Sequence, residues 1–251
     1  MKSLKKVAGA VCALLAAAAV SAQDSSSQAK SETSAESSYL SSVEDVVITE
    51  LANSAERDNK LVALQYLENA VDEGRTTPDM MAALDSLAGE GITSQSRTNG
   101  RLMNNYPDIR AKACELLGKV PSEESKTSLK KIALADNEPM VITAAVRSLG
   151  DIGMNENDDV TETIAWAQKR NAILNPTSSL ALEVLIAYEK LADTVQDKSQ
   201  MIQSVGSIAT NYNYVTPVRQ RALELLKKLQ GASGSNSSGK SSSKNSAENA
   251  K

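Results

Sequence analysis

Side chains able to carry out catalysis are scarce in this chain of 251 residues. It has no histidine, the residue that serves as the base in Ser-His-Asp and Cys-His sites, as a metal ligand and as a pH switch. No Gly-x-Ser-x-Gly, P-loop or Gly-x-Gly-x-x-Gly motif occurs. A Ser/Lys nucleophile pair stays open, because such pairs assemble in space from distant parts of a sequence. The sequence therefore predicts neither an enzyme nor a cofactor site.

One acidic segment has the beginning of a calcium-binding pattern. Asn155, Asn157 and Asp159 have the 1-3-5 spacing of an EF-hand loop. The pattern then fails, because Val160 stands at the glycine position and Trp166 at the position of the bidentate glutamate. We therefore expect a solvated acidic turn and no metal ion.

Cysteine chemistry is equally limited. The chain has two cysteines, and Cys12 lies in the apolar N-terminal segment. Removal of that segment would leave Cys114 alone, which excludes an intrachain disulfide and a multi-cysteine zinc site. Cys114 follows Ala113 on an apolar helical face, so we expect a small buried side chain rather than a reactive thiol.

Residues suited to binding are more prominent than residues suited to catalysis. Arginine and tyrosine are enriched among interface anchors, and several of them lie in or beside predicted loops, including the long segment from Gly89 to Tyr106. The candidate partner-binding residues are Arg97, Arg101, Tyr106, Arg110, Tyr214 and Arg219. In contrast, we expect Trp166 and Tyr188 to fill the core of a protein that has no phenylalanine.

Helices must position these residues, because one apolar pattern with helical spacing occurs four times. Its members lie at positions i, i+4, i+7 and i+8. The four sets are Ile109, Ala113, Leu116 and Leu117; Val141, Ala145, Ser148 and Leu149; Leu180, Val184, Ala187 and Tyr188; and Val218, Ala222, Leu225 and Leu226. A helical face that returns every 32 to 39 residues indicates a stack of helix pairs.

Turn residues indicate where the helices begin and end. Prolines at positions 78, 107, 139 and 217 lie near expected helix starts, where proline is tolerated. We predict helices over residues 41–54 and 59–73, a third from Thr77-Pro78, and about ten helices in five antiparallel pairs. Asp158 or Asp159 is expected to cap the helix that carries Ile164.

The order of turn and helix residues is similar to that of a known family. Asp136 at a helix end is followed by Pro139, and the next helix carries Ala144-Ala145 and ends on Leu149-Gly150. Two further units have the same order, namely Pro107-Asp108-Ile109-Arg110 with Ala113 and Leu117-Gly118, and Pro217-Val218-Arg219 with Ala222. This resembles the HEAT-repeat pattern, here in a secreted bacterial type. Ile142 stands at the arginine position of the second unit, and the unit at Leu180 lacks the proline, arginine and glycine.

The resemblance covers residues 106–230 well and residues 39–105, a divergent N-terminal helical cap, only loosely. It implies an all-α fold, a short right-handed α-solenoid of about five antiparallel helix pairs. Arrays of this kind act as scaffolds and as surfaces that bind peptides or proteins. The resemblance is specific for architecture and carries no catalytic residue over to this chain.

The N-terminus predicts export. Residues 1–22 have the features of a signal peptide: lysines at positions 2, 5 and 6, a short apolar stretch over residues 7–20, and small residues before a cleavage site that follows Ala22. An uncleaved N-terminal anchor is one alternative. A lipoprotein modified at Cys12 is another, although that cysteine lies inside the apolar stretch rather than at its end.

Two polar segments flank the expected domain. Residues 23–38 form a Ser-rich leader and residues 231–251 a Ser/Lys-rich tail, both expected to be disordered. Removal of residues 1–22 leaves a net charge of −7 and no second apolar stretch, which argues against nucleic-acid binding and against stable membrane insertion. The lysines of the tail also allow a weak contact with an anionic envelope polymer.

These observations predict an exported, periplasmic protein-interaction scaffold without enzymatic activity. Its partner would be a protein or peptide, and its specificity would come from loop residues such as Arg97 and Arg101. Two alternatives stay open: an envelope or cell-wall-associated structural protein, and a lyase or hydrolase built on the same scaffold.

Overall fold

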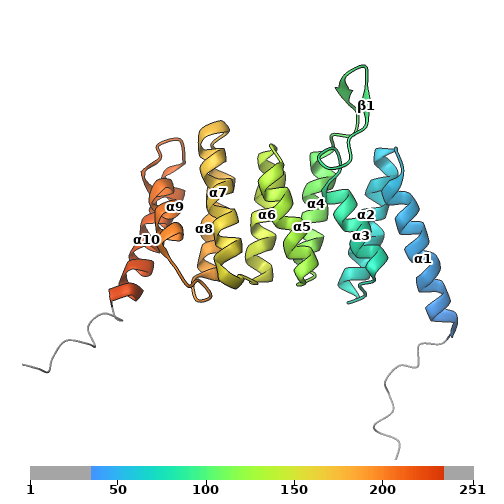
Figure 1. Ribbon diagram of the computed structural model, residues 1–251, viewed down its shortest axis with the longest axis horizontal. Helices are drawn as coiled ribbons and strands as arrows, with labels where there is room; N and C mark the ends of the chain where they lie inside the picture. Colours follow the sequence, from blue (N-terminus) through green and yellow to red (C-terminus); the bar gives the residue numbers. More distant parts are fainter. Residues whose placement is uncertain (1–34, 235–251) are drawn as a thin grey trace, which may run out of the picture. The chain divides into compact units, whose positions relative to one another are not determined.

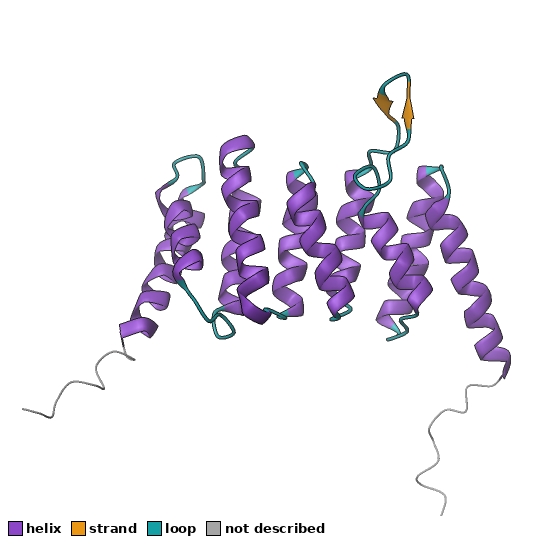
Figure 2. Ribbon diagram, in the orientation of Figure 1, coloured by secondary structure: helices purple, strands orange, loops and turns teal. Residues whose placement is uncertain are grey.

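The computed structural model describes residues 35–234, and most of this part is helical (Figures 1 and 2). It contains α1 (Ala35–Asn53), α2 (Arg57–Asp72), α3 (Pro78–Ala88), α4 (Pro107–Gly118), α5 (Glu123–Ala135), α6 (Pro139–Ile152), α7 (Asp159–Leu174), α8 (Ser178–Leu191), α9 (Ser199–Thr210) and α10 (Thr216–Gly234). A short 3-10 helix, η1 (Glu156–Asp158), precedes α7, and β1 (Arg97–Thr98) and β2 (Arg101–Leu102) form a hairpin. The prediction of an all-α chain with about ten helices is thus confirmed for the described part.

The limits of the described part bear on the predicted segments. The predicted signal peptide, with Cys12, lies outside the described residues, as do residues 23–34 and 235–251. Helix α1 begins four residues before the predicted domain start at residue 39, and α10 ends four residues after residue 230. The chain divides into two compact units after Glu44. No helix within residues 35–234 is both long and apolar enough to cross a lipid bilayer.

Within residues 45–234 the helices pack largely in sequential, adjacent pairs. Contacts join α3 to α4, α5 to α6, α7 to α8 and α9 to α10. Further contacts link α2, α4, α6, α8 and α10 in one series, and α3, α5, α7 and α9 in a second (Figure 1). Each helix from α3 to α10 therefore packs against its partner and against a helix two places away along the chain.

The repeated apolar face forms the contact between successive pairs. Ile109, Leu117, Leu149 and Val184 from this face are fully buried, and burial of each such side chain stabilises the fold by about 1.5–3 kcal/mol. Close approach of α4 and α6 depends on Gly118, where a Cβ atom would come within 2.6 Å of the Ser148 side chain. Ser148 is the third member of the set that begins at Val141, and it is the only polar member of the four sets at that position.

A hydrogen bond explains how the polar Ser148 can lie in an otherwise apolar set. Its hydroxyl donates a hydrogen bond of 2.8 Å to the carbonyl oxygen of Cys114 on α4. Gly150 plays the same spacing role toward α8, because a Cβ atom there would lie 2.9 Å from Ala187. Small side chains at these positions therefore let three successive helices of one series approach closely.

A buried ion pair connects α4 to the turn between α5 and α6. Arg110 and Asp136 side chains are each 1% exposed, and the guanidinium donates through Nε at 2.6 Å and Nη2 at 3.2 Å to the carboxylate. The same carboxylate accepts a hydrogen bond of 2.9 Å from the Glu138 backbone N–H at the start of α6. The structure thus places Arg110, a predicted partner-binding residue, in the protein interior as one half of this ion pair.

Side chains cap α3 and α5 from the N-cap position, through Thr77 and Ser122, whereas the cap of α7 comes from an unexpected residue. Thr77 accepts a hydrogen bond from the Met80 N–H at the start of α3. At α7, however, the side-chain oxygen of Asn155 accepts from the Val160 and Thr161 N–H groups, at 3.2 and 3.1 Å. The expected aspartate cap is thus wrong.

The Asp158 side chain binds a neighbouring turn instead of capping α7. Asp158 has a left-handed backbone, with φ of 62°, and its carboxylate accepts hydrogen bonds from the Gln196 and Asp197 N–H groups at 2.9 and 2.8 Å. These bonds connect the turn before α7 to the turn before α9. The acidic segment therefore joins two neighbouring turns.

Candidate partner-binding groove

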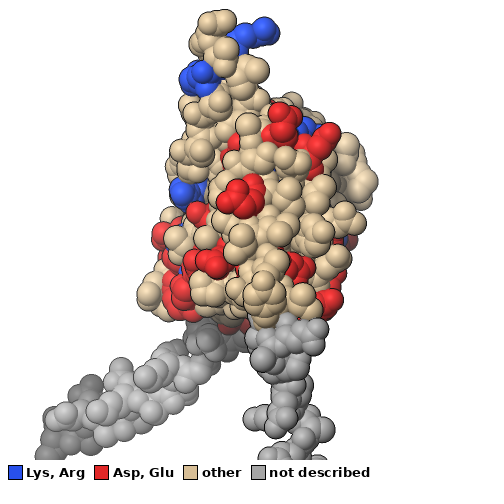
Figure 3. Space-filling model, turned by 90° about the vertical axis from the view of Figure 1, so that its right-hand side faces the viewer, with Lys and Arg blue, Asp and Glu red and all other residues tan. Residues whose placement is uncertain are grey.

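The predicted loop between α3 and α4 contains a projecting β-hairpin. Arg97 pairs with Leu102 and Thr98 with Arg101, and the turn residues Asn99 and Gly100 have φ of 50° and 79°. Arg97 and Arg101 are exposed and are the only charged residues of segment 91–105. Figure 3 shows Lys and Arg side chains on this projection and Asp and Glu side chains spread over the surface below it.

Buried polar side chains anchor the base of the hairpin. The amide of Asn104 donates to Glu90 Oε1 at 2.6 Å and to the Ser94 carbonyl at 2.7 Å, and its oxygen accepts from the Ser96 N–H at 2.8 Å. Glu90 is also paired with the buried Lys60, with an Nζ–Oε2 distance of 3.0 Å. The hairpin is therefore fixed at its base by groups that belong to the helical body.

The other predicted partner-binding residues lie apart from the hairpin. Tyr106 is half-buried before α4 and packs against the core. Tyr214, in the turn between α9 and α10, is 4% exposed and packs in the core. Arg219 lies at the same turn, with its guanidinium carbon 5.0 Å from the centre of the exposed Tyr212 ring. The structure does not bring the predicted residues into one site.

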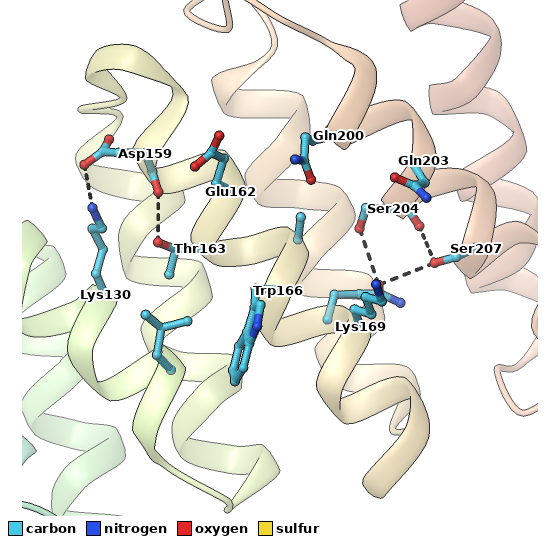
Figure 4. Close-up of a pocket in the computed structure, with 13 residues that line it drawn as sticks. Lys130, Asp159, Glu162, Thr163, Trp166, Lys169, Gln200, Gln203, Ser204 and Ser207 are labelled. Atoms are coloured by element: carbon cyan, nitrogen blue, oxygen red, sulfur yellow. Dashed lines mark hydrogen bonds and ion pairs between the residues drawn. The ribbon is translucent and has the colours of Figure 1, made fainter.

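A groove runs along the outer surface of α7. It has a volume of about 760 Å³ and lies between α5 on one side and α9 on the other (Figure 4). Its lining residues are Lys130, Leu134, Asp159, Glu162, Thr163, Ala165, Trp166, Gln168, Lys169, Gln200, Gln203, Ser204 and Ser207. The volume lies in the range of ligand-binding pockets, about 300–1,000 Å³.

Trp166 lies in this groove and corrects a prediction. We expected it in the core, but its residue surface is 50% exposed, whereas Tyr188 is fully buried as expected. The Arg170 guanidinium carbon lies 5.0 Å from the centre of the indole ring, and the same guanidinium donates to the backbone carbonyls of Leu134 and Asp136. The indole is therefore held in place by a fixed cation and remains open to solvent.

An apolar stripe continues from Trp166 along α7. Ile173, two turns further on, is 77% exposed, and Leu134 on α5 is 38% exposed. Tryptophan and arginine are both enriched in protein-interaction hot spots, and here they lie beside exposed aliphatic side chains. None of these three residues was predicted from the sequence to bind a partner.

The inner wall of the groove, beside α9, is polar and mostly uncharged. Gln168 is 2% exposed, and its side-chain oxygen accepts from the Ser204 and Ser207 hydroxyls at 3.5 and 3.4 Å. Burial raises the pKa of Tyr188, and the Ser204 side chain opposes part of that rise. Burial likewise raises the pKa of Tyr214, opposed by Gln168. Both phenols therefore stay neutral, and this cluster adds no charge to the groove.

The charges that line the groove cancel. Lys130 and Asp159 form an ion pair at 2.7 Å, and Glu162 and Lys169 are exposed and opposite in sign. Residues 35–234 as a whole carry 28 acidic and 20 basic side chains, a net charge of −8. The groove is thus a neutral region on an acidic protein.

Among residues 35–234, no group of three or more cysteine, aspartate or glutamate side chains could hold a metal ion. Cys114 is fully buried, and this burial raises the pKa of its thiol far above the ordinary value. The prediction of a buried cysteine is confirmed, and its thiol is not placed to act as a nucleophile.

Comparison with known proteins identifies no relative of this chain. No protein-family model matches the chain, and no curated protein or solved structure matches it. Any function must therefore be argued from the residues themselves.

Proposed function

We propose that this protein is an exported, non-enzymatic interaction scaffold that binds a polypeptide partner in the α5–α7–α9 groove. The scaffold would be a short right-handed, HEAT-like α-solenoid, and the two series of helix contacts support this proposal. The signal-like sequence of residues 1–22 supports export to the periplasm.

The observation that carries the proposal is the exposed Trp166 inside a groove lined by three helices. Exposure of the indole has a hydrophobic cost that a partner would remove. The contact with Arg170 favours one orientation of the ring, which would reduce the ordering that binding requires. An aromatic side chain exposed in a concave site is a typical interface anchor.

The proposal can be tested by quantitative co-purification from cell-envelope extracts with two matched variants. Trp166→Ala removes the groove aromatic, and Tyr212→Ala removes an aromatic that is 88% exposed at the α9–α10 turn. Loss of an interface anchor costs about 2 kcal/mol or more, which weakens binding roughly 30-fold. We expect partner recovery to fall with Trp166→Ala and to stay unchanged with Tyr212→Ala.

The opposite pattern would assign binding to the α9–α10 turn with Arg219. Equal recovery with wild type and both variants would contradict the groove proposal. Circular dichroism of both variants controls for folding, because both side chains lie at the surface.

A further inference from the structure

The α9 wall of the groove presents two amide side chains that the fold itself does not use. Gln200 and Gln203 lie one helical turn apart, are exposed, and extend toward the groove (Figure 4). Neither makes a side-chain hydrogen bond with any part of the chain within residues 35–234. Each amide offers two N–H donors and one carbonyl acceptor. The wall can therefore donate to and accept from the same ligand.

The backbone of an extended polypeptide supplies matching groups. The backbone N–H and C=O groups of an extended segment are free to bind other groups, whereas those of a helix are already hydrogen-bonded within the helix. A helical partner would cover Gln200 and Gln203 and leave their amides without hydrogen bonds, which is unfavourable once water is excluded. The two amides thus favour an extended segment over a helical one.

The charge distribution limits the composition of that segment. The four charged residues that line the groove sum to zero, so neither an acidic nor a basic peptide gains a net electrostatic attraction there. The net charge of −8 on residues 35–234 repels an acidic segment and attracts a basic one to many other sites. An uncharged segment avoids both effects.

We propose, on the basis of the proposed function, that the groove holds an extended, uncharged polypeptide segment. Gln200 and Gln203 hydrogen-bond its backbone, and an aliphatic or proline side chain packs on the open face of Trp166. The binding site is specific for backbone conformation and for one apolar side chain rather than for charge.

The single tryptophan of the chain makes the inference directly testable. Its emission reports on the groove without a label. The purified protein is titrated with a pool of capped peptides of about seven residues built from Ser, Thr, Gln, Val, Leu and Pro. Matched pools carry N-methylated backbones, carry added Glu or Lys, or are stapled as helices, and a neutral oligosaccharide serves as a second class of ligand.

We expect saturable binding of the uncharged pool and about tenfold weaker binding of the N-methylated pool, because the backbone donors are lost. The Gln200→Ala/Gln203→Ala variant should show the same loss, whereas Gln220→Ala, an exposed site on α10, should bind as wild type. The affinity for the uncharged pool should be the same at low and at high salt concentration.

Three outcomes would overturn the inference. They are equal binding of the N-methylated pool, preferential binding of the stapled or charged pools, and saturation by the oligosaccharide alone. Absence of any emission change also counts against it. Truncation after residue 234 provides a final control, because a shift in the Trp166 emission on truncation would make the chain's own tail the occupant. A partner that depends on Trp166 but binds as a helix would overturn this inference and leave the proposed function intact.

Discussion

Replacement of Arg110 by methionine is expected to destabilise the protein severely. The substitution removes four hydrogen bonds: two to Asp136, one of 3.2 Å to the Glu90 carbonyl and one of 3.0 Å to the Asn105 side chain. The Asp136 carboxylate, 1% exposed, would keep only its bond from the Glu138 N–H. Loss of one partner from such a buried pair costs about 3–5 kcal/mol, a large fraction of the roughly 5–15 kcal/mol that stabilises a typical domain.

The assay is urea unfolding followed by circular dichroism and by the emission of Trp166. The control is Arg147→Met, which removes ion pairs of 2.9 Å with Glu183 and 3.5 Å with Glu115. The Arg147 side chain is 43% exposed, so its loss should cost less than about 1 kcal/mol.

A double variant tests the physical cause. Arg110→Met/Asp136→Leu removes both charges, so it should recover at least half of the stability that Arg110→Met loses, because no unpaired buried carboxylate remains. A single variant within about 1 kcal/mol of wild type would refute the reasoning. A double variant that is no more stable than Arg110→Met would show that the cost lies in packing and not in the unpaired charge.

Three further predictions concern backbone spacing, thiol reactivity and pH. Gly118→Ala should destabilise the protein by about 1–3 kcal/mol through overpacking, whereas Gly206→Ala, with open space around its Cβ position, should stabilise it by about 0.5–1 kcal/mol; thermal unfolding measures both. The raised pKa of Cys114 keeps its thiol neutral, so a thiol reagent should label it only after unfolding. A hydrogen bond from the Lys126 side chain lowers the pKa of Glu156 below its ordinary value of 4.5. The pair therefore stabilises the folded state fully at pH values above 4.5. This stabilisation is lost as the pH falls through the lowered pKa. NMR titration should show that pKa returning toward its ordinary value in Lys126→Met.

The repeated helical face could be predicted because periodicity alone determines which side chains share a face. Ile109, Leu149 and Val184 recur with the same offsets, and all three are fully buried. The small residues that follow, Gly118 and Gly150, were recognised as helix ends. Their close contacts with the neighbouring helices depend on tertiary packing and were not visible in the sequence.

Trp166 shows why the candidate site was missed. Helix α7 carries two stripes with the same i, i+4, i+7 spacing, and Val160, Ile164 and Ala167 form the buried one. Trp166 and Ile173 belong to the second stripe, which is exposed. Periodicity cannot decide which stripe faces the core, but the arginine inside the second stripe was a signal that this face meets solvent.

The β-hairpin and the burial of Arg110 were not predicted from the sequence, for two different reasons. Asn99-Gly100 is a strong signal for a two-residue hairpin turn, so the β-hairpin was present in the sequence and was overlooked. Arg110 and Asp136 were both recognised as members of the HEAT-like pattern, but Arg110 was also named as a candidate partner-binding residue. Its burial depends on the ion pair with Asp136, a partner 26 residues away, and the pattern was not used to predict that pairing.

Site-specific photocrosslinking in the native envelope tests the central claim most directly. A photoreactive residue at position 203 faces the groove, and the same residue at position 220 lies on exposed α10. The proposed function predicts one reproducible protein crosslink from position 203, lost in Trp166→Ala, and none from position 220. Absence of a crosslink at position 203, or the same products from both positions, would contradict it.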